Sequence, residues 1–184
     1  MKHSLSYVFL SMVPLLLFAQ KGTSSVAELQ STTEQLSKIK DPKVLLEKTD
    51  SLRLHGKHEA AIEYAYKALE LAKERQNHKV ATNELYDIIL LNKSIKNFDE
   101  CAHYFENRDS ILGFEPSAYE LAMFLSVYGD VYILKGELEK GIKTLFAADS
   151  IFENIGRSSM DVKMRLAYAY SDYGQKDIAN QYLF

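Results

Sequence analysis

The sequence predicts an all-α fold, and three observations lead to that prediction. The 184 residues include only 8 Gly and 3 Pro, so few residues favour the tight turns that join β-strands. Ala, Leu, Lys, Glu and Tyr, which are all compatible with helix, are abundant, and no run alternates polar and apolar residues over the length of a strand. A pattern of paired helices recurs at a fixed interval after residue 41.

Composition and charge narrow the class of protein. With 47% hydrophobic and 26% charged residues the chain matches an ordinary globular domain, which excludes a disordered or collagen-like chain. The single cysteine excludes a disulfide within the chain. The 22 Lys and Arg residues against 25 Asp and Glu give a net charge of −3, without the basic excess of nucleic-acid-binding proteins. We therefore expect no nucleic-acid partner.

Residues 1–20 are predicted to be a signal peptide. Lys2 precedes an uncharged run from residue 7 to residue 19, and such a run is too short for a comfortable membrane span of about 20 residues. The Phe-Ala-Gln ending resembles bacterial signal peptides, and we expect cleavage near residues 19–25. The alternative is an uncleaved N-terminal anchor, because the bulky Leu17 would occupy the −3 position. With either a cleaved signal peptide or an uncleaved anchor, we expect the protein in the periplasm or cell envelope.

Residues 21–41 follow as a linker or a short leading helix. A polar stretch is followed by apolar residues at Val26, Leu29, Leu36 and Ile39, which is a weak helical spacing. The pair Asp41-Pro42 then marks a helix start, because Asp can cap free amides and Pro suits the first helical position.

The rest of the chain repeats. Segments that begin at Gly56, Lys96 and Gly136 are evenly spaced, about 40 residues apart, and a fourth begins slightly sooner, at Gly174. Each reads as helix, tight turn, helix. The expected helices are 42–55, 58–75, 79–94, 97–112, 116–135, 138–154, 159–173 and 175–183. The expected units are 42–78, 79–115, 116–157 and 158–184, the last of them incomplete.

The repeated positions resemble the tetratricopeptide repeat. The third unit matches best, at Leu125, Tyr128, Gly129, Tyr132, Gly136, Gly141, Leu145 and Ala148. The second diverges most: Lys96 replaces the turn Gly, Ile89 the helix Gly and Arg108 a later Ala, while Cys101 fills a small-residue position. The resemblance covers residues 42–184. It implies a right-handed superhelix, an α-solenoid of about four repeats of about 40 residues.

No spacing in the sequence indicates catalysis. The glycines form no phosphate-binding loop. His55, His58 and Glu59 straddle a turn, and a zinc site needs three or four convergent ligands. Cys101 and His103 are two positions apart, so on a helix their side chains point in different directions. We expect no catalytic residue, no metal ligand and no cofactor, and we expect that the protein is not an enzyme.

The resemblance also implies a binding surface. In this family the first helix of each unit lines the concave face, where peptide or protein partners bind. The corresponding positions here are Leu46, Asp50, Arg53, Tyr86, Leu90, Lys93, Met123, Ser126, Asp130, Met164, Tyr168 and Asp172. They depart from the Lys/Asn/Arg clamp with which some members hold a terminal carboxylate, and suit an amphipathic segment or a helix instead. For each position the alternative is internal packing.

Two functions remain open from the sequence. The first is a protein–protein interaction scaffold of the bacterial envelope. The second is the periplasmic sensor region of a membrane signalling protein or transcriptional regulator, because the Asp-Ser-Ile triplets at 109–111 and 149–151 resemble such regions. The chain stops inside an expected second helix, so residues 178–184 should be the least well packed. That end is expected either to continue further or to be covered by a partner or a second copy.

Overall fold

The computed structural model describes residue 36 and residues 38–183. The predicted signal peptide and most of the predicted linker lie outside the described residues. The chain divides into one unit over residues 1–41 and another over residues 42–184, and the second contains the repeats. No described helix combines the length and apolarity needed to cross a membrane.

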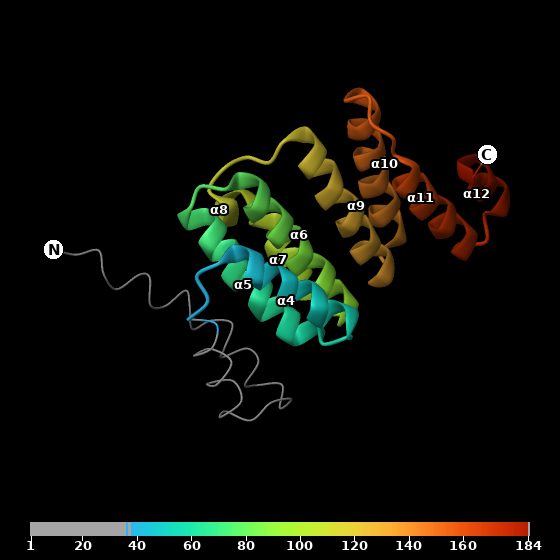
Figure 1. Ribbon diagram of the computed structural model, residues 1–184. Helices are drawn as coiled ribbons and strands as arrows, with labels where there is room; N and C mark the ends of the chain where they lie inside the picture. The colour runs from blue at the N-terminus through green and yellow to red at the C-terminus, as the bar shows by residue number, and fades with distance from the viewer. Residues whose placement is uncertain (1–35, 37, 184) are drawn as a thin grey trace. The chain divides into compact units, whose positions relative to one another are not determined.

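Within the described residues, the second unit is built of helices alone. Figure 1 shows them following one another in pairs along the chain. The pairs are α4 (Pro42–Leu54) with α5 (His58–Glu74), α6 (His78–Ser94) with α7 (Phe98–Glu106) and α8 (Arg108–Leu112), α9 (Ala118–Leu134) with α10 (Leu138–Asn154), and α11 (Met160–Asp172) with α12 (Lys176–Leu183). The predicted all-α class is confirmed, and the helix bounds agree with the prediction to within two residues except in the second unit.

The exception is the helix predicted over 97–112, which is broken at Asn107. This residue has φ −101° and ψ 10°, outside the helical region, and ends α7. Its side-chain amide donates a hydrogen bond to the carbonyl oxygen of His103 at 2.8 Å. The same oxygen accepts a hydrogen bond from the backbone N–H of Asn107 at 3.1 Å, and a new short helix, α8, starts at the next residue. Asn side chains that bond to nearby backbone groups in this way favour helix ends over helix interiors.

The turn inside each pair needs a left-handed residue. Gly56, Gly136 and Gly174 occupy it with φ between +70° and +82°, a conformation that costs glycine nothing. In the second unit Lys96 takes the same conformation, with φ +59°. The geometry of the repeat is therefore kept where its glycine is missing, at the cost of a strained lysine.

Glycines also let α9 and α10 approach closely. A Cβ atom added at Gly129 would lie 2.7 Å from Cγ of Leu145, and one added at Gly141 would lie 2.5 Å from Cγ1 of Ile133. Small residues therefore face each other where this pair of helices crosses.

Two hydrophobic cores meet at α9. One side of this helix places Phe124, Val127 and Val131 in a core formed with α5, α6, α7 and α8. Its other side places Ala122 in a core formed with α10 and α11. A helix that packs into two cores must be apolar around most of its circumference, and the sequence of Ala118–Leu134 meets this requirement.

Candidate functional site

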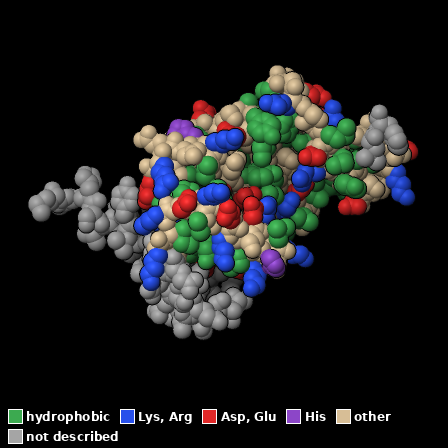
Figure 2. Space-filling model, in the orientation of Figure 1, with side chains coloured by type: hydrophobic (Ala, Val, Ile, Leu, Met, Phe, Trp, Pro, Cys, Tyr) green, Lys and Arg blue, Asp and Glu red, His purple; other side chains and the backbone are tan. Residues whose placement is uncertain are grey.

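The residues predicted to bind a partner lie on the first helices α4, α6, α9 and α11, and we call the surface formed by these helices the first-helix face. Along it α6 packs against α9, and α9 against α11. Exposed members of the predicted set are Asp50, Arg53, Met164, Tyr168 and Asp172; half-buried members are Leu46, Tyr86, Leu90, Lys93, Met123 and Asp130; Ser126 is buried. Acidic, basic and apolar side chains intermingle on the side of the molecule seen in Figure 2.

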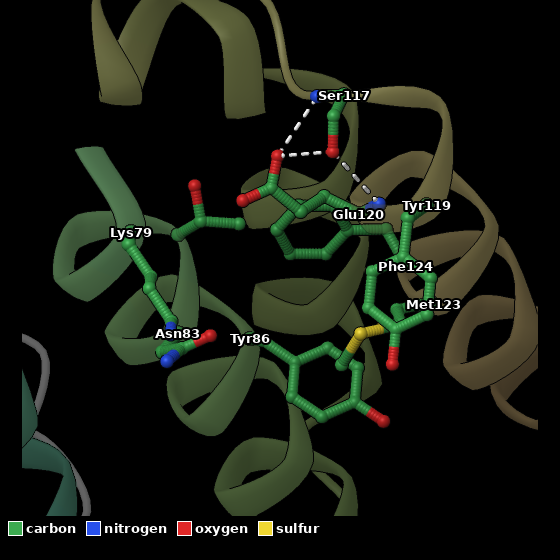
Figure 3. A pocket seen from close by; sticks show the side chains of 9 residues that line it. Lys79, Asn83, Tyr86, Ser117, Tyr119, Glu120, Met123 and Phe124 are labelled. Atoms are coloured by element: carbon green, nitrogen blue, oxygen red, sulfur yellow. Dashed lines mark hydrogen bonds between the residues drawn. The ribbon is translucent and has the colours of Figure 1, made fainter.

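A hollow of about 420 Å³ lies between the N-terminal halves of α6 and α9 (Figure 3). It is lined mainly by the apolar parts of Lys79, Thr82, Asn83, Tyr86, Ser117, Tyr119, Glu120, Met123 and Phe124. Two predicted residues, Tyr86 and Met123, thus come together in one cavity from different repeats. The other lining residues were missed, because their convergence depends on how α6 and α9 are placed rather than on either helix alone.

Packing holds the aromatic walls of the hollow in place. The ring of Tyr86 lies 6.0 Å from that of the fully buried Phe124. Burial raises the pKa of the Tyr86 phenol, so this hydroxyl stays neutral. Tyr119 is half-exposed at the rim, with its ring edge-on to Phe152 at 5.7 Å and the Arg157 guanidinium 5.8 Å from its centroid. These contacts fix the shape of the hollow before any partner binds.

One rim of the hollow is the beginning of α9. The side chain of Ser117 accepts a hydrogen bond from the backbone N–H of Glu120 at 3.4 Å, and the Glu120 carboxylate accepts from the Ser117 N–H at 2.8 Å (Figure 3). This reciprocal capping box fixes where the helix starts. The Glu120 carboxylate lines the hollow, but it is already hydrogen-bonded to Ser117.

Further along the same face, Asp130 joins three first helices. Its Oδ2 atom accepts a hydrogen bond from Lys93 Nζ of α6 at 2.9 Å and another from Arg165 Nη1 of α11. We call these three residues the 93–130–165 triad. Its side chains are 20%, 18% and 30% exposed respectively, so each still reaches solvent. Two cations on one carboxylate leave a net charge of +1.

Burial acts on the lysine of this triad. It lowers the pKa of the Lys93 ammonium, and the neighbouring positive charge of Arg165 lowers it further. Lys93 and Asp130 were both predicted to contact a partner, and the structure brings them into contact with each other. Arg165 was missed, because its reach to α9 follows from the placement of α11.

The other end of the face carries three carboxylates. Arg53 of α4 lies 2.6 Å from Asp50 on its own helix and 3.9 Å from Asp87 on α6. Beside them Glu84 is only 1% exposed, and its Oε2 atom has no hydrogen-bond partner among the described residues. Burial, together with the charges of Asp87 and Asp50, raises the pKa of Glu84 to about 8, while Arg53 acts in the opposite direction. This carboxyl is protonated at neutral pH.

Glu84 was not predicted to belong to the site, although its spacing in the sequence indicates that it is buried. It stands three residues after Ala81 and four before Ile88, so helical spacing places it on the buried stripe of α6. A charged residue inside an apolar stripe indicates a group with a shifted pKa.

The other candidates from the sequence include Cys101 on α7 and His55, which directly follows α4. Cys101 is fully buried and its Sγ lies 3.4 Å from the carbonyl oxygen of Ile89, as expected of a small packing residue. Burial raises its pKa to about 12, so the thiol is not a nucleophile. His55 is exposed, and its Nδ1 lies 2.6 Å from the carbonyl oxygen of Ser51. In the part of the chain that the structure describes, no three His, Cys, Asp or Glu side chains come together as a metal site would require.

Comparison with solved structures identifies the architecture. A putative kinesin light chain from Podosopora anserina, described as having nearly identical TPR-like repeats, superposes with a TM-score of 0.61 at 15% identity, over 79% of this chain and 74% of its own. The fold is a tetratricopeptide-type solenoid. The apo form of RapI matches 97% of this chain and 68% of its own, with a TM-score of 0.65 and 17% identity. MamA (residue 41 to the end) from Desulfovibrio magneticus RS-1 matches 85% and 84%, with a TM-score of 0.55 and 19% identity.

Comparison by sequence finds less. No protein-family model and no curated protein matches the chain. The solved structures therefore support the tetratricopeptide resemblance of residues 42–184, whereas the sequence comparisons do not detect it.

Proposed function

We propose that this protein is a non-enzymatic interaction scaffold of the cell envelope that binds a peptide segment or helix of a partner protein on its first-helix face. The hollow between α6 and α9 carries the proposal: it is apolar, open to solvent and built from two repeats. A concave, mainly apolar site with a few polar groups at its edge is the usual form of a binding pocket. The tetratricopeptide-type fold favours a protein as the partner.

The side chains in the hollow suit a helix or an amphipathic segment. Tyr86 and Tyr119 offer large, rigid apolar surfaces, and aromatic residues of this kind dominate binding energy at interfaces. Met123 adds a flexible thioether that adapts to the shape of an incoming side chain. A large apolar side chain of the partner would fill the space between them, in the mode by which a helix is anchored in a groove.

The test is a selection of peptides from a random library on the immobilised full chain. Selected peptides should lose about tenfold or more in affinity for the Met123→Ala variant, because the mutated side chain lines the hollow. Ile155→Ala removes an apolar side chain that is 38% exposed at the end of α10 and does not line the hollow, and it serves as the matched control. Peptides that bind both variants as tightly as the wild type would overturn the proposal, as would crosslinks that map to the second helices.

The location in the envelope is a separate proposal that rests on residues 1–20. The uncharged run before Ala19 supports export and cleavage. N-terminal sequencing of the protein recovered from a bacterial periplasm should give a first residue between 20 and 26. An intact N-terminus on cytoplasmic protein would contradict export.

A further inference from the structure

We propose that the partner segment carries an Asp or Glu side chain that binds Lys93 and Arg165, about 10 Å along a helix from the apolar side chain that fills the hollow. This inference rests on the proposed function and specifies the chemistry of the partner. Two observations carry it: the charge of the 93–130–165 triad and its position relative to the hollow.

The charge of the triad is unbalanced. Among the described residues, Asp130 is the single carboxylate that is ion-paired with both Lys93 and Arg165, so the three half-buried side chains together carry a net charge of +1. Both cations keep accessible surface, with 20% and 30% of their side chains exposed. A second carboxylate brought by a partner would neutralise this charge, and charge-assisted hydrogen bonds to Lys and Arg are stronger than neutral ones.

The position of the triad sets the spacing. Lys93 follows Tyr86 on α6 by seven residues, and Asp130 follows Met123 on α9 by seven residues. Seven residues are almost two full helical turns, so the triad lies on the same side of these helices as the hollow, about 10 Å further along. A partner helix that spans the hollow and the triad has its apolar residue and its acidic residue seven positions apart, in either order.

We assign the acid to a side chain rather than to a chain terminus, because the first-helix positions depart from the Lys/Asn/Arg clamp with which some tetratricopeptide proteins hold a terminal carboxylate.

The probes for the test are fluorescein-labelled peptides of about 16 residues, long enough to form a helix in water and blocked at both ends so that no terminal carboxylate is present. Each has a Phe within a small apolar patch in an Ala/Gln-rich background. One has a Glu seven residues after the Phe, another has it seven residues before, and each has a matched version with Gln. The Glu peptide of one order should bind about fivefold to tenfold more tightly than its Gln version, and this difference should shrink with added salt.

Variants of the protein assign the effect to the triad. Lys93→Gln and Arg165→Gln should each abolish the preference for Glu. Lys135→Gln removes an exposed lysine just beyond the end of α9 and should leave the preference intact. Asp130→Asn raises the net charge of the site and should strengthen the preference, which keeps the proposal testable if loss of a cation impairs folding. Thermal melts of each variant check that it is folded.

The outcomes separate this inference from the proposed function. Equal binding of Glu and Gln peptides, with both dependent on Met123, would overturn the acidic partner and leave the proposed function standing. Binding of no probe, or binding unaffected by Met123→Ala, would overturn both.

Discussion

The backbone carbonyl oxygen of Gly129 on α9 would lie only 2.9 Å from a Cβ atom placed at Gly141 on α10. A neighbouring side chain can rotate away from such a contact, whereas a helical carbonyl oxygen cannot move without shifting its helix. The pair therefore sets how closely the two helices of the third repeat pack.

Gly141→Ala should destabilise the protein by about 2 kcal/mol. The added methyl group overpacks the crossing, which typically costs about 1–3 kcal/mol, while the better helix propensity of Ala returns up to about 1 kcal/mol. Urea denaturation followed by circular dichroism measures the change. Ser150→Ala, at an exposed position on the same helix, is the control and should change stability by less than about 0.5 kcal/mol. A Gly141→Ala variant as stable as the wild type would mean that α9 and α10 are farther apart.

Lys96→Gly should stabilise the protein by about 0.5–1 kcal/mol. Lys96 has φ +59°, and the left-handed conformation costs an ordinary residue about 1–2 kcal/mol. Glycine avoids this cost, but the unfolded chain is more flexible with glycine, so the net stabilisation is smaller than the strain relieved. Lys57→Gly is the matched control: this lysine follows a repeat turn with φ −88°, so glycine relieves no strain there and should destabilise. If both substitutions lower the urea midpoint, Lys96 is not strained.

The stability of the protein should fall as the pH rises from about 5 to about 8, in part because of Glu84. Its pKa is about 8 in the folded state and ordinary in the unfolded state, so over this range the folded protein holds a proton that the unfolded chain has lost. The contribution is fully present at low pH and decreases by up to ~1.4 kcal/mol per pH unit. Glu84→Gln, which is neutral at every pH, should flatten this dependence, as measured by urea denaturation between pH 5 and pH 9.

Other groups contribute to the same profile. Burial raises the pKa of Glu63 and Asp87 as well, so the variant keeps some of the slope. Glu59→Gln, at an exposed position in the first turn of α5, should reproduce the wild-type profile. Identical profiles for Glu84→Gln and the wild type would show that Glu84 ionises normally in the folded state.

The amides of α12 should exchange with deuterium faster than those of any other helix of eight or more residues within residues 42–183. Of residues 176–182 only Ala179 is buried, and the stacking of Tyr182 on Tyr170, with ring centroids 5.8 Å apart, is its main aromatic contact with α11. Helices with few buried contacts open at low free-energy cost. Hydrogen exchange read by mass spectrometry should show protection about 100-fold or more below that of α9. Equal protection in the two helices would contradict the expectation from sequence that residues 178–184 pack least well.

The repeat could be read from the sequence because it depends on local chemistry. Turn glycines that recur about every 40 residues, and the small pair Gly129 and Gly141, follow directly from how two helices turn and cross. The break at Asn107 could not be predicted with the same ease, since Asn is tolerated within helices and only its backbone angles, φ −101° and ψ 10°, reveal the interruption. Lys96 shows the converse: the turn forms although its preferred residue is absent.

The site was predictable as a surface and not as a set of contacts. The tetratricopeptide resemblance placed Tyr86 and Met123 on the first-helix face, but the hollow they share depends on the packing of two repeats. The bond between Arg165 and Asp130 crosses from α11 to α9, and a single sequence contains no measure of that distance. Glu84 was the exception, because its place in the apolar stripe of α6 is visible in the sequence.

The shared role of α9 bears on how the solenoid unfolds. Stacked repeats often melt piecemeal, since each unit contacts only its neighbours. Here one helix contributes side chains to both cores, so neither half of residues 42–183 can lose its structure without exposing apolar surface of the other. We expect a single cooperative transition, with the two halves thermodynamically coupled through α9.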